Sequence, residues 1–257
     1  MLTVISVFTC LSFSAVYPLA FWLVRGHPIN EGFRKFNLGL TNFIGGSGLV
    51  LLLFMNVPVS VKALALLWKA SLISVSAYSW KREKINTWLM SFPSVLGIMA
   101  CVFFQREFIA VNFESVVVMI LGGIILCVSL FAMILGHWYL NVTGLPIKYL
   151  RKTTNAFWFF LIIRGLWDIF FLVTKKIIHG GDSILIYQFL ARVDGFLLSI
   201  ALFFGTLLPI ILIHFVLETL KVKSTQSATG LLYIIVIAVL MGDLAYKYYL
   251  FRFSLFL

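Results

Sequence analysis

The sequence has 257 residues, of which 62% are hydrophobic and only 11% are charged. Soluble domains carry about 25% charged residues, so this composition excludes a water-soluble protein. The net charge of +11 is scattered between apolar stretches rather than gathered on one face, which argues against a nucleic-acid partner and for basic loops facing anionic lipid.

A spanning helix needs about 20 mostly apolar residues, and eight stretches qualify. They cover roughly residues 3–24, 37–57, 60–80, 87–105, 115–139, 154–175, 186–217 and 229–250. Pro58 predicts a tight turn between the second and third stretches. The seventh stretch is too long for one perpendicular crossing, so we expect an interfacial start, a tilt, or a kink near Pro209. The predicted fold class is all-α transmembrane.

The Lys and Arg residues predict the orientation. The connectors after stretches 1, 3, 5 and 7 hold eleven of them, and the opposite side with both termini holds six. The eleven are Arg25, Arg34, Lys35, Lys81, Arg82, Lys84, Lys148, Arg151, Lys152, Lys221 and Lys223. Because basic loops stay in the cytoplasm, we expect both termini outside.

Two segments about 117 residues apart resemble each other. Phe21-Trp22 is followed by Pro28-Ile29 and then by Arg34-Lys35, whereas His137-Trp138 is followed by Pro146-Ile147 and then by Arg151-Lys152. Four spans per half would give both halves the same orientation, so the pattern predicts eight helices as two parallel-related four-helix halves. We place the halves at residues 1–110 and 111–257. The alternative is two unrelated basic loops, each after an aromatic belt.

Charged residues inside the apolar stretches are the main candidates for a functional site. Ionised groups in a bilayer cost several kcal/mol unless they meet partners or water. By helix depth, six of them share the outer half of the membrane and balance in charge: Lys69, Arg164 and Arg192 against Asp168, Asp194 and Asp243. Asp243 and Lys247 also lie four residues apart, on one helix face. The set is either a static salt-bridge network or a polar cavity for a quinone, a proton path or a small anion.

Two histidines, His137 and His214, are expected near the cytoplasmic ends of their spans and so at one depth. Two axial histidines could hold a b-type haem, and the alternative is a pair of interfacial side chains. Glu218 follows His214 by four residues and could pair with it. Cys10, Cys101 and Cys127 stand singly without CxxC spacing, which predicts packing residues and no metal site.

The connector from Lys221 to Gly230 is the densest run of hydroxyl and amide side chains. Its plain interpretation is an N-cap for the last span. The alternative is that Ser224 and Gln226, with the helix N-terminus, bind a headgroup, a quinone oxygen or a partner subunit.

The stretches Gly136-His-Trp-Tyr-Leu and Ser224-Thr-Gln-Ser-Ala-Thr-Gly resemble a family of bacterial inner-membrane proteins of uncharacterised activity. The layout is also similar to the eight-helix, quinol-handling membrane subunits of polysulfide and DMSO reductases, by analogy alone. These resemblances imply a multi-pass protein of the bacterial cytoplasmic membrane with protein partners in a respiratory-type complex.

Three functions therefore stay open. The first is a membrane subunit that interacts with quinone or supports electron and proton transfer. The second is a proton-coupled small-molecule transporter, and the third is a non-catalytic scaffold or assembly subunit. Whether the protein is an enzyme differs between these hypotheses, and so does its need for a cofactor.

Overall fold

The computed structural model describes residues 1–25, 30–82, 84–142, 146–179 and 181–257. Helices make up 84% of the chain, and within the described residues eight helical segments are long and apolar enough to cross a bilayer. This confirms the all-α transmembrane class. The chain divides into two compact units, residues 1–131 and 132–257.

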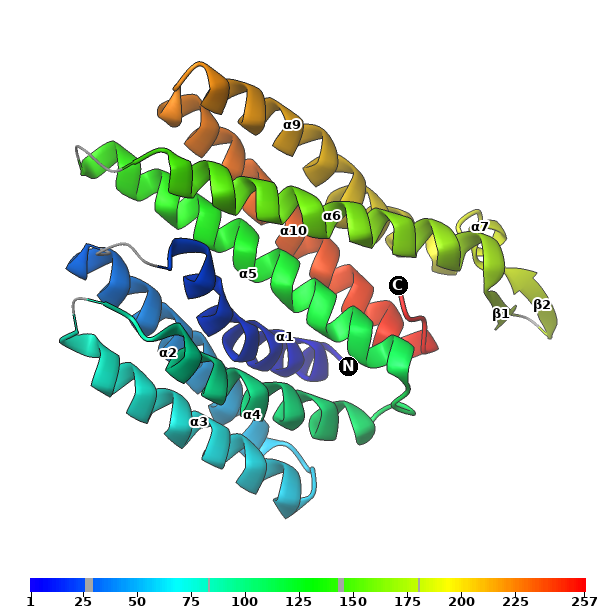
Figure 1. The fold of residues 1–257 in the computed structure, drawn as a ribbon. Coiled ribbons are helices and arrows are strands. Elements are labelled where there is room, and N and C mark those ends of the chain that lie inside the picture. Colours follow the sequence, from blue (N-terminus) through cyan, green and yellow to red (C-terminus); the bar gives the residue numbers. More distant parts are fainter. Residues whose placement is uncertain (26–29, 83, 143–145, 180) are drawn as a thin grey trace. The chain divides into compact units, whose positions relative to one another are not determined.

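The first unit is built on α1 (Leu2–Val16) and the 3-10 segment η1 (Tyr17–Val24). The first span is therefore not one α-helix, and the change of helix type comes where Pro18 removes a backbone donor. Three further helices complete a ring, α2 (Glu31–Phe54), α3 (Val59–Trp80) and α4 (Thr87–Arg106). Helix α1 packs against α2 and α4, and α3 closes the ring between them (Figure 1). Pro58 is the N-cap of α3, as the predicted turn requires.

Helix α5 (Phe113–Asn141) is continuous and contributes to both units. In the first unit, Phe131 meets the rings of Tyr17, Phe21 and Phe33 edge-on. In the second unit, the last turns of α5 lie against α10, where Gly136 is in contact with Thr229. The boundary between the units thus falls inside α5, twenty-one residues beyond the 110/111 division that the sequence suggests.

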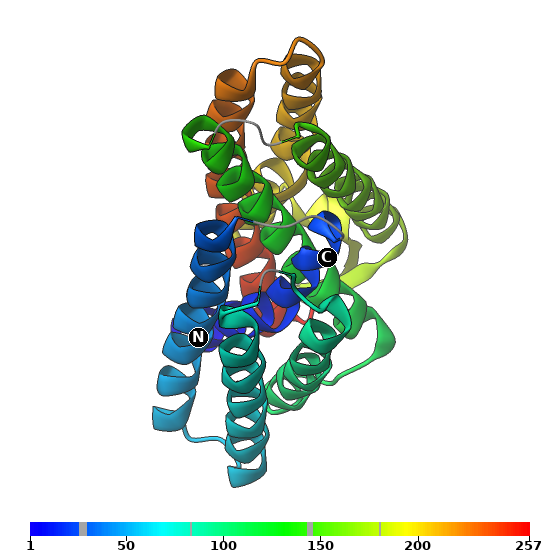
Figure 2. The same ribbon diagram turned by 60° about the vertical axis from the view of Figure 1, so that its left-hand side comes forward.

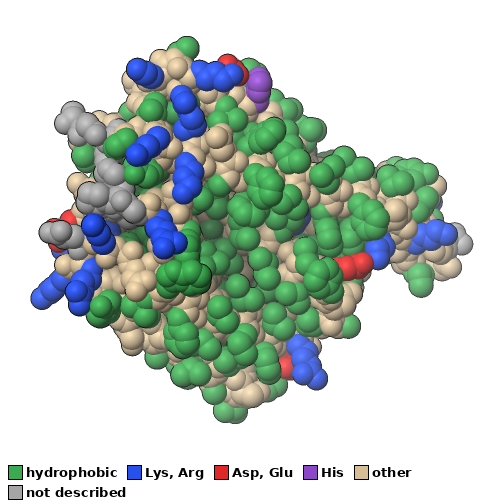
Figure 3. Space-filling view, viewed as in Figure 1, with side chains coloured by type: hydrophobic (Ala, Val, Ile, Leu, Met, Phe, Trp, Pro, Cys, Tyr) green, Lys and Arg blue, Asp and Glu red, His purple; other side chains and the backbone are tan. Residues whose placement is uncertain are grey.

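The second unit contains α6 (Lys148–Thr174), α9 (Leu208–Lys221) and α10 (Thr225–Phe253). Helices α9 and α10 run side by side in both ribbon views (Figure 1 and Figure 2). Along α6 and α9, Figure 3 shows hydrophobic side chains over most of the length and basic side chains towards the ends that hold residues 148–152 and 221–223. That distribution is the one expected of lipid-facing helices with basic ends.

The long seventh stretch is divided as its length and Pro209 suggest. A short helix α7 (Ile186–Phe189) and a 3-10 turn η2 (Val193–Gly195) precede α8 (Phe196–Leu202). A π-helical segment, η3 (Phe203–Leu207), then leads into α9, in which Pro209 occupies the first turn. Because Pro209 has no N–H, it cannot donate to the preceding turn, and the backbone widens there.

One short element lies outside the predicted fold class. Strands β1 (Lys176–His179) and β2 (Asp182–Leu185) form an antiparallel hairpin between α6 and α7. Gly181 adopts φ +92° in its turn, a conformation that favours glycine.

The two units share a feature at corresponding arginines. Arg34 Nη2 donates to the Trp80 carbonyl at the end of α3 (3.1 Å), and Arg151 Nη2 donates to the Leu220 carbonyl near the end of α9 (3.2 Å). Both arginines bond a carbonyl in the last turn of a helix, where carbonyl groups have no partner further along the helix. Arg34 and Arg151 are the residues that the predicted repeat aligns, so the contact agrees with the repeat. Pro28 and Ile29, also part of that alignment, lie outside the described residues.

Candidate functional site

The candidate site is centred on Arg164 and Asp168 of α6. They are four residues apart, and Arg164 Nε lies 3.1 Å from Asp168 Oδ1. The two residues are only 2% and 3% exposed. Arg164 is the seventeenth of the 27 residues in α6, about 24 Å from its start, which is near the middle of the helix. The two charges, four residues apart in the sequence, thus lie together within one spanning helix.

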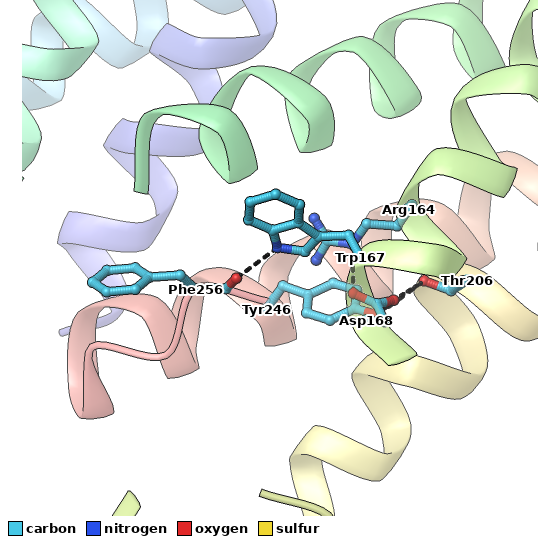
Figure 4. Close-up of polar contacts among 6 residues, drawn as sticks. All are labelled: Arg164, Trp167, Asp168, Thr206, Tyr246 and Phe256. Carbon is cyan, nitrogen blue, oxygen red and sulfur yellow. Dashed lines mark hydrogen bonds and ion pairs between the residues drawn. The ribbon is translucent and has the colours of Figure 1, made fainter. Parts of the chain in front are cut away.

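Two hydroxyl groups from other helices complete the coordination of Asp168. Thr206 Oγ1 and Tyr246 Oη each donate to Asp168 Oδ2 over 2.7 Å, and the two hydroxyls lie 2.9 Å apart (Figure 4). The Tyr246 ring also lies under the Arg164 guanidinium, whose Cζ is 3.8 Å from the ring centroid. Residues from α6, η3 and α10 thus converge on one carboxylate. We call Arg164, Asp168, Thr206 and Tyr246 the Asp168 network.

The backbone brings Thr206 and Tyr246 together through two glycines. A Cβ atom at Gly242 would lie 2.1 Å from the Gly205 Cα, and one at Gly205 would lie 2.5 Å from the Tyr246 ring. Only glycine allows η3 and α10 to approach so closely, as small residues do in other membrane helix pairs. The π-helical turn at residues 203–207 then directs Thr206 towards Asp168.

Part of the Asp168 network lacks hydrogen bonds. Three buried atoms have no hydrogen-bond partner: Arg164 Nε, Arg164 Nη2 and Asp168 Oδ1. Of these, Nε and Oδ1 are within ion-pair distance of each other. The two atoms are near enough for charge attraction but are not aligned for a hydrogen bond. Buried polar groups are usually satisfied, so the guanidinium keeps unused donor capacity.

A second ion pair lies on the same face of α10 as Tyr246. Lys247 Nζ is 2.5 Å from Asp243 Oδ2, and both side chains are buried. The Asp243 carboxylate also interacts electrostatically with Arg164. The buried set in the second unit is thus Arg164 and Lys247 against Asp168 and Asp243, balanced two against two.

Arg192 and Asp194 do not belong to this buried set. Arg192 directly precedes the seventh span, which begins at Val193, and Asp194 lies in its first turn, η2. Both side chains are exposed. The Tyr249 hydroxyl donates to the Asp194 backbone carbonyl (2.5 Å). The sequence analysis placed them in the cluster because it started this span at residue 186. The first α-helix of the span, α8, begins only at Phe196, so both residues precede it.

Lys69 lies in the first unit. It is 8% exposed, and its ammonium donates to the backbone carbonyl and to Oδ1 of Asn42, at 2.6 and 3.1 Å. Both of these acceptors are uncharged.

The histidines do not fit a buried haem. The His137 side chain is exposed, and both its ring nitrogens are engaged, Nε2 with Asn141 and Nδ1 with Tyr233, each at 3.2 Å. His214 is also exposed, and Glu218 forms its ion pair with Lys221 at 2.6 Å. An axial ligand needs a nitrogen free to bind iron inside an apolar cavity.

Ser224 and Gln226 lie at the start of α10, as the N-cap interpretation requires. Ser224 is the N-cap residue, but its hydroxyl donates to the Ser227 hydroxyl (2.9 Å) rather than accepting from the backbone. Gln226 is exposed.

Sequence analysis missed Thr206 and Tyr246. A single hydroxyl in an apolar stretch is ordinary, so Thr206 carried no signal. Tyr246 lies three residues after Asp243 and so on the same helix face, a spacing that could have pointed to it.

No protein-family model, curated protein or solved structure matches the chain.

Proposed function

We propose that the protein is a proton-coupled membrane transporter in which Asp168 is the proton-binding carboxylate. The supporting observation is this buried carboxylate, the twenty-first of the 27 residues of a spanning helix, held by an arginine and by hydroxyls from two further segments. Ionisable residues buried in membrane spans commonly serve proton relays and substrate paths.

The coupling step follows from charge. A proton that binds Asp168 neutralises the carboxylate and removes the charge that holds the Arg164 guanidinium. Arg164 then keeps Asp243 as an acidic group with which it already interacts electrostatically. Thr206 and Tyr246 can both donate and accept hydrogen bonds, so they can stay bonded to either form of Asp168. Protonation thereby favours a different pairing between α6 and α10.

The local structure suits such a change. The π-helical segment η3 carries Thr206 and lies directly before Pro209. π-helical turns are often found at functional sites, and a break in helical hydrogen bonding is a natural hinge. The unused donors of Arg164 also favour this function over a static scaffold, whose buried network would be expected to be satisfied.

A quinone-handling subunit is the second candidate. It is supported by the Arg164 guanidinium, which has unused donors and stacks on the Tyr246 ring, because a quinone carbonyl needs a donor. Under either function we place the protein in the bacterial cytoplasmic membrane. Partner subunits belong to the quinone-handling function.

Proton flux in proteoliposomes tests the transporter. Vesicles loaded with a pH-sensitive dye receive an imposed pH gradient and a panel of amino acids, monocarboxylates and organic cations. We expect one solute class to collapse the gradient faster than in empty vesicles. Asp168→Asn should abolish this flux, whereas Asp194→Asn, which changes an exposed carboxylate, should keep it.

Other outcomes identify the alternatives. A normal flux in Asp168→Asn would overturn the role of this carboxylate. Absence of any solute-dependent flux, together with quinone extracted from the purified protein, would identify the redox subunit instead.

A further inference from the structure

A groove in the first unit ends at a buried cation. It lies between α2 and α3 and has a volume of about 630 Å³, within the range of small-molecule sites. Its lining is mainly apolar. It is formed by Gly39, Asn42, Lys69, Ile73, Ser76, Ala77, Trp80 and Lys81.

The cation is Lys69, and its surroundings leave its charge uncompensated. An ammonium has three donors, and two of them meet the uncharged oxygens of Asn42. The Asn42 amide nitrogen donates to Ser76 and to the Leu38 carbonyl, which turns the amide oxygen towards Lys69. Within the described parts of the chain, Lys69 forms no ion pair. A buried positive charge without a counter-charge is unfavourable, and an anionic partner would stabilise it.

The position of Lys69 restricts the ligand. Lys69 is the eleventh of 22 residues in α3, about 16 Å from either end, so the phosphate of a bilayer lipid does not reach it. The groove extends from Lys69 towards Trp80 and Lys81, about 18 Å along the helix. Gly46 leaves room beside the ammonium, because a Cβ there would lie 3.8 Å from Nζ.

We propose that this groove binds an amphiphilic monocarboxylate, such as a long-chain fatty acid, with its carboxylate on Lys69 and its hydrocarbon chain along α3 towards Trp80. The carboxylate supplies the missing negative charge, and the apolar lining accepts the chain. This site is independent of the Asp168 network, and its test does not depend on transport.

Binding of a fluorescent polyene fatty acid to the full-length protein in nanodiscs tests the site, with empty nanodiscs as the blank. The matched probe is the methyl ester of the same acid, which keeps the chain and loses the charge. We expect the acid to bind at least about tenfold more tightly than the ester, as a charge-assisted hydrogen bond implies.

Three variants locate the carboxylate. Lys69→Gln should remove the preference for the acid and leave ester binding unchanged, and Lys69→Arg should restore the preference. Lys62→Gln, which changes a half-buried lysine of the same helix outside the groove, should have no effect. Equal binding of acid and ester by the unaltered protein would overturn the proposal without any variant. Loss of the preference in Lys81→Gln but not in Lys69→Gln would also overturn it, by placing the anion at the membrane surface.

Discussion

At the scale of residues, the second unit solves the problem of burying charge by pairing it. Arg164 with Asp168 and Lys247 with Asp243 make neutral pairs along two neighbouring helices. Each pair is local, four residues apart on one helix, so the helix itself holds the partners together. The hydroxyls of Thr206 and Tyr246 then join the first pair to other segments. Pairing explains how the charges are tolerated, and the hydroxyls explain why Asp168 is the centre.

The first prediction concerns the Arg164–Asp168 pair. Arg164→Met leaves a buried carboxylate without its counter-charge, which should lower the free energy of unfolding by about 3–5 kcal/mol. The double variant Arg164→Met/Asp168→Leu removes both charges and should recover most of this loss. Denaturant unfolding in detergent micelles gives the free energy of unfolding of Arg164→Met, of Asp168→Leu and of the double variant. Arg192→Met serves as an exposed control. Losses that simply add in the double variant would show that the pair does not interact.

At the scale of elements, the contact between η3 and α10 positions the site. The approach of Gly205 to Gly242 is a backbone contact, so no side-chain rotation can relieve a larger residue there. It sets the distance from Thr206 to Tyr246, and therefore the pair of hydroxyls on Asp168.

The second prediction compares two glycines of α10. Gly242→Ala places a methyl group 2.1 Å from the Gly205 backbone, so the helices must separate, and overpacking of this kind costs about 1–3 kcal/mol or more. Gly230→Ala meets no atom within 4 Å and should be neutral or slightly stabilising. The thermal midpoint of each variant in detergent measures the difference. Equal midpoints would mean that η3 and α10 are not in close contact.

At the scale of the whole molecule, the distribution of basic residues predicts the orientation of the chain. The ends of α6 and α9 with Lys148, Arg151 and Lys221 should face the cytoplasm, and the η2 connection should face outside.

The third prediction tests this orientation with two single cysteines. Val193→Cys is at an exposed site in η2 (94% exposed for Val193) and should react with an impermeant maleimide in intact cells. Lys152→Cys, exposed near the start of α6, should react only after the membrane is opened. Cys10 is first replaced by Ser, and the buried Cys101 and Cys127 can remain. The opposite labelling pattern would reverse the topology.

Much of this architecture could be predicted from the sequence, because a bilayer imposes simple rules on a chain. Apolar length predicts the spans, and Pro58 and Pro209 mark a turn and a distortion where the structure has them. The spacing of Arg164 and Asp168 predicts their pairing, since residues four apart must be neighbours on a helix. Arg192 and Asp194 are exposed and do not join the buried set, because composition does not show where a helix begins inside a long apolar stretch.

The length of the apolar stretches was therefore enough to predict the membrane class, and the four-residue spacing was enough to predict the ion pairs within single helices. Only the tertiary structure decided which groups from separate helices meet. Thr206 and Tyr246 reach Asp168 because two glycines bring a π-helical turn against α10, and Lys69 meets Asn42 because α2 packs on α3. Such contacts depend on how the helices pack in three dimensions, and the spacing of residues along the sequence does not show this packing.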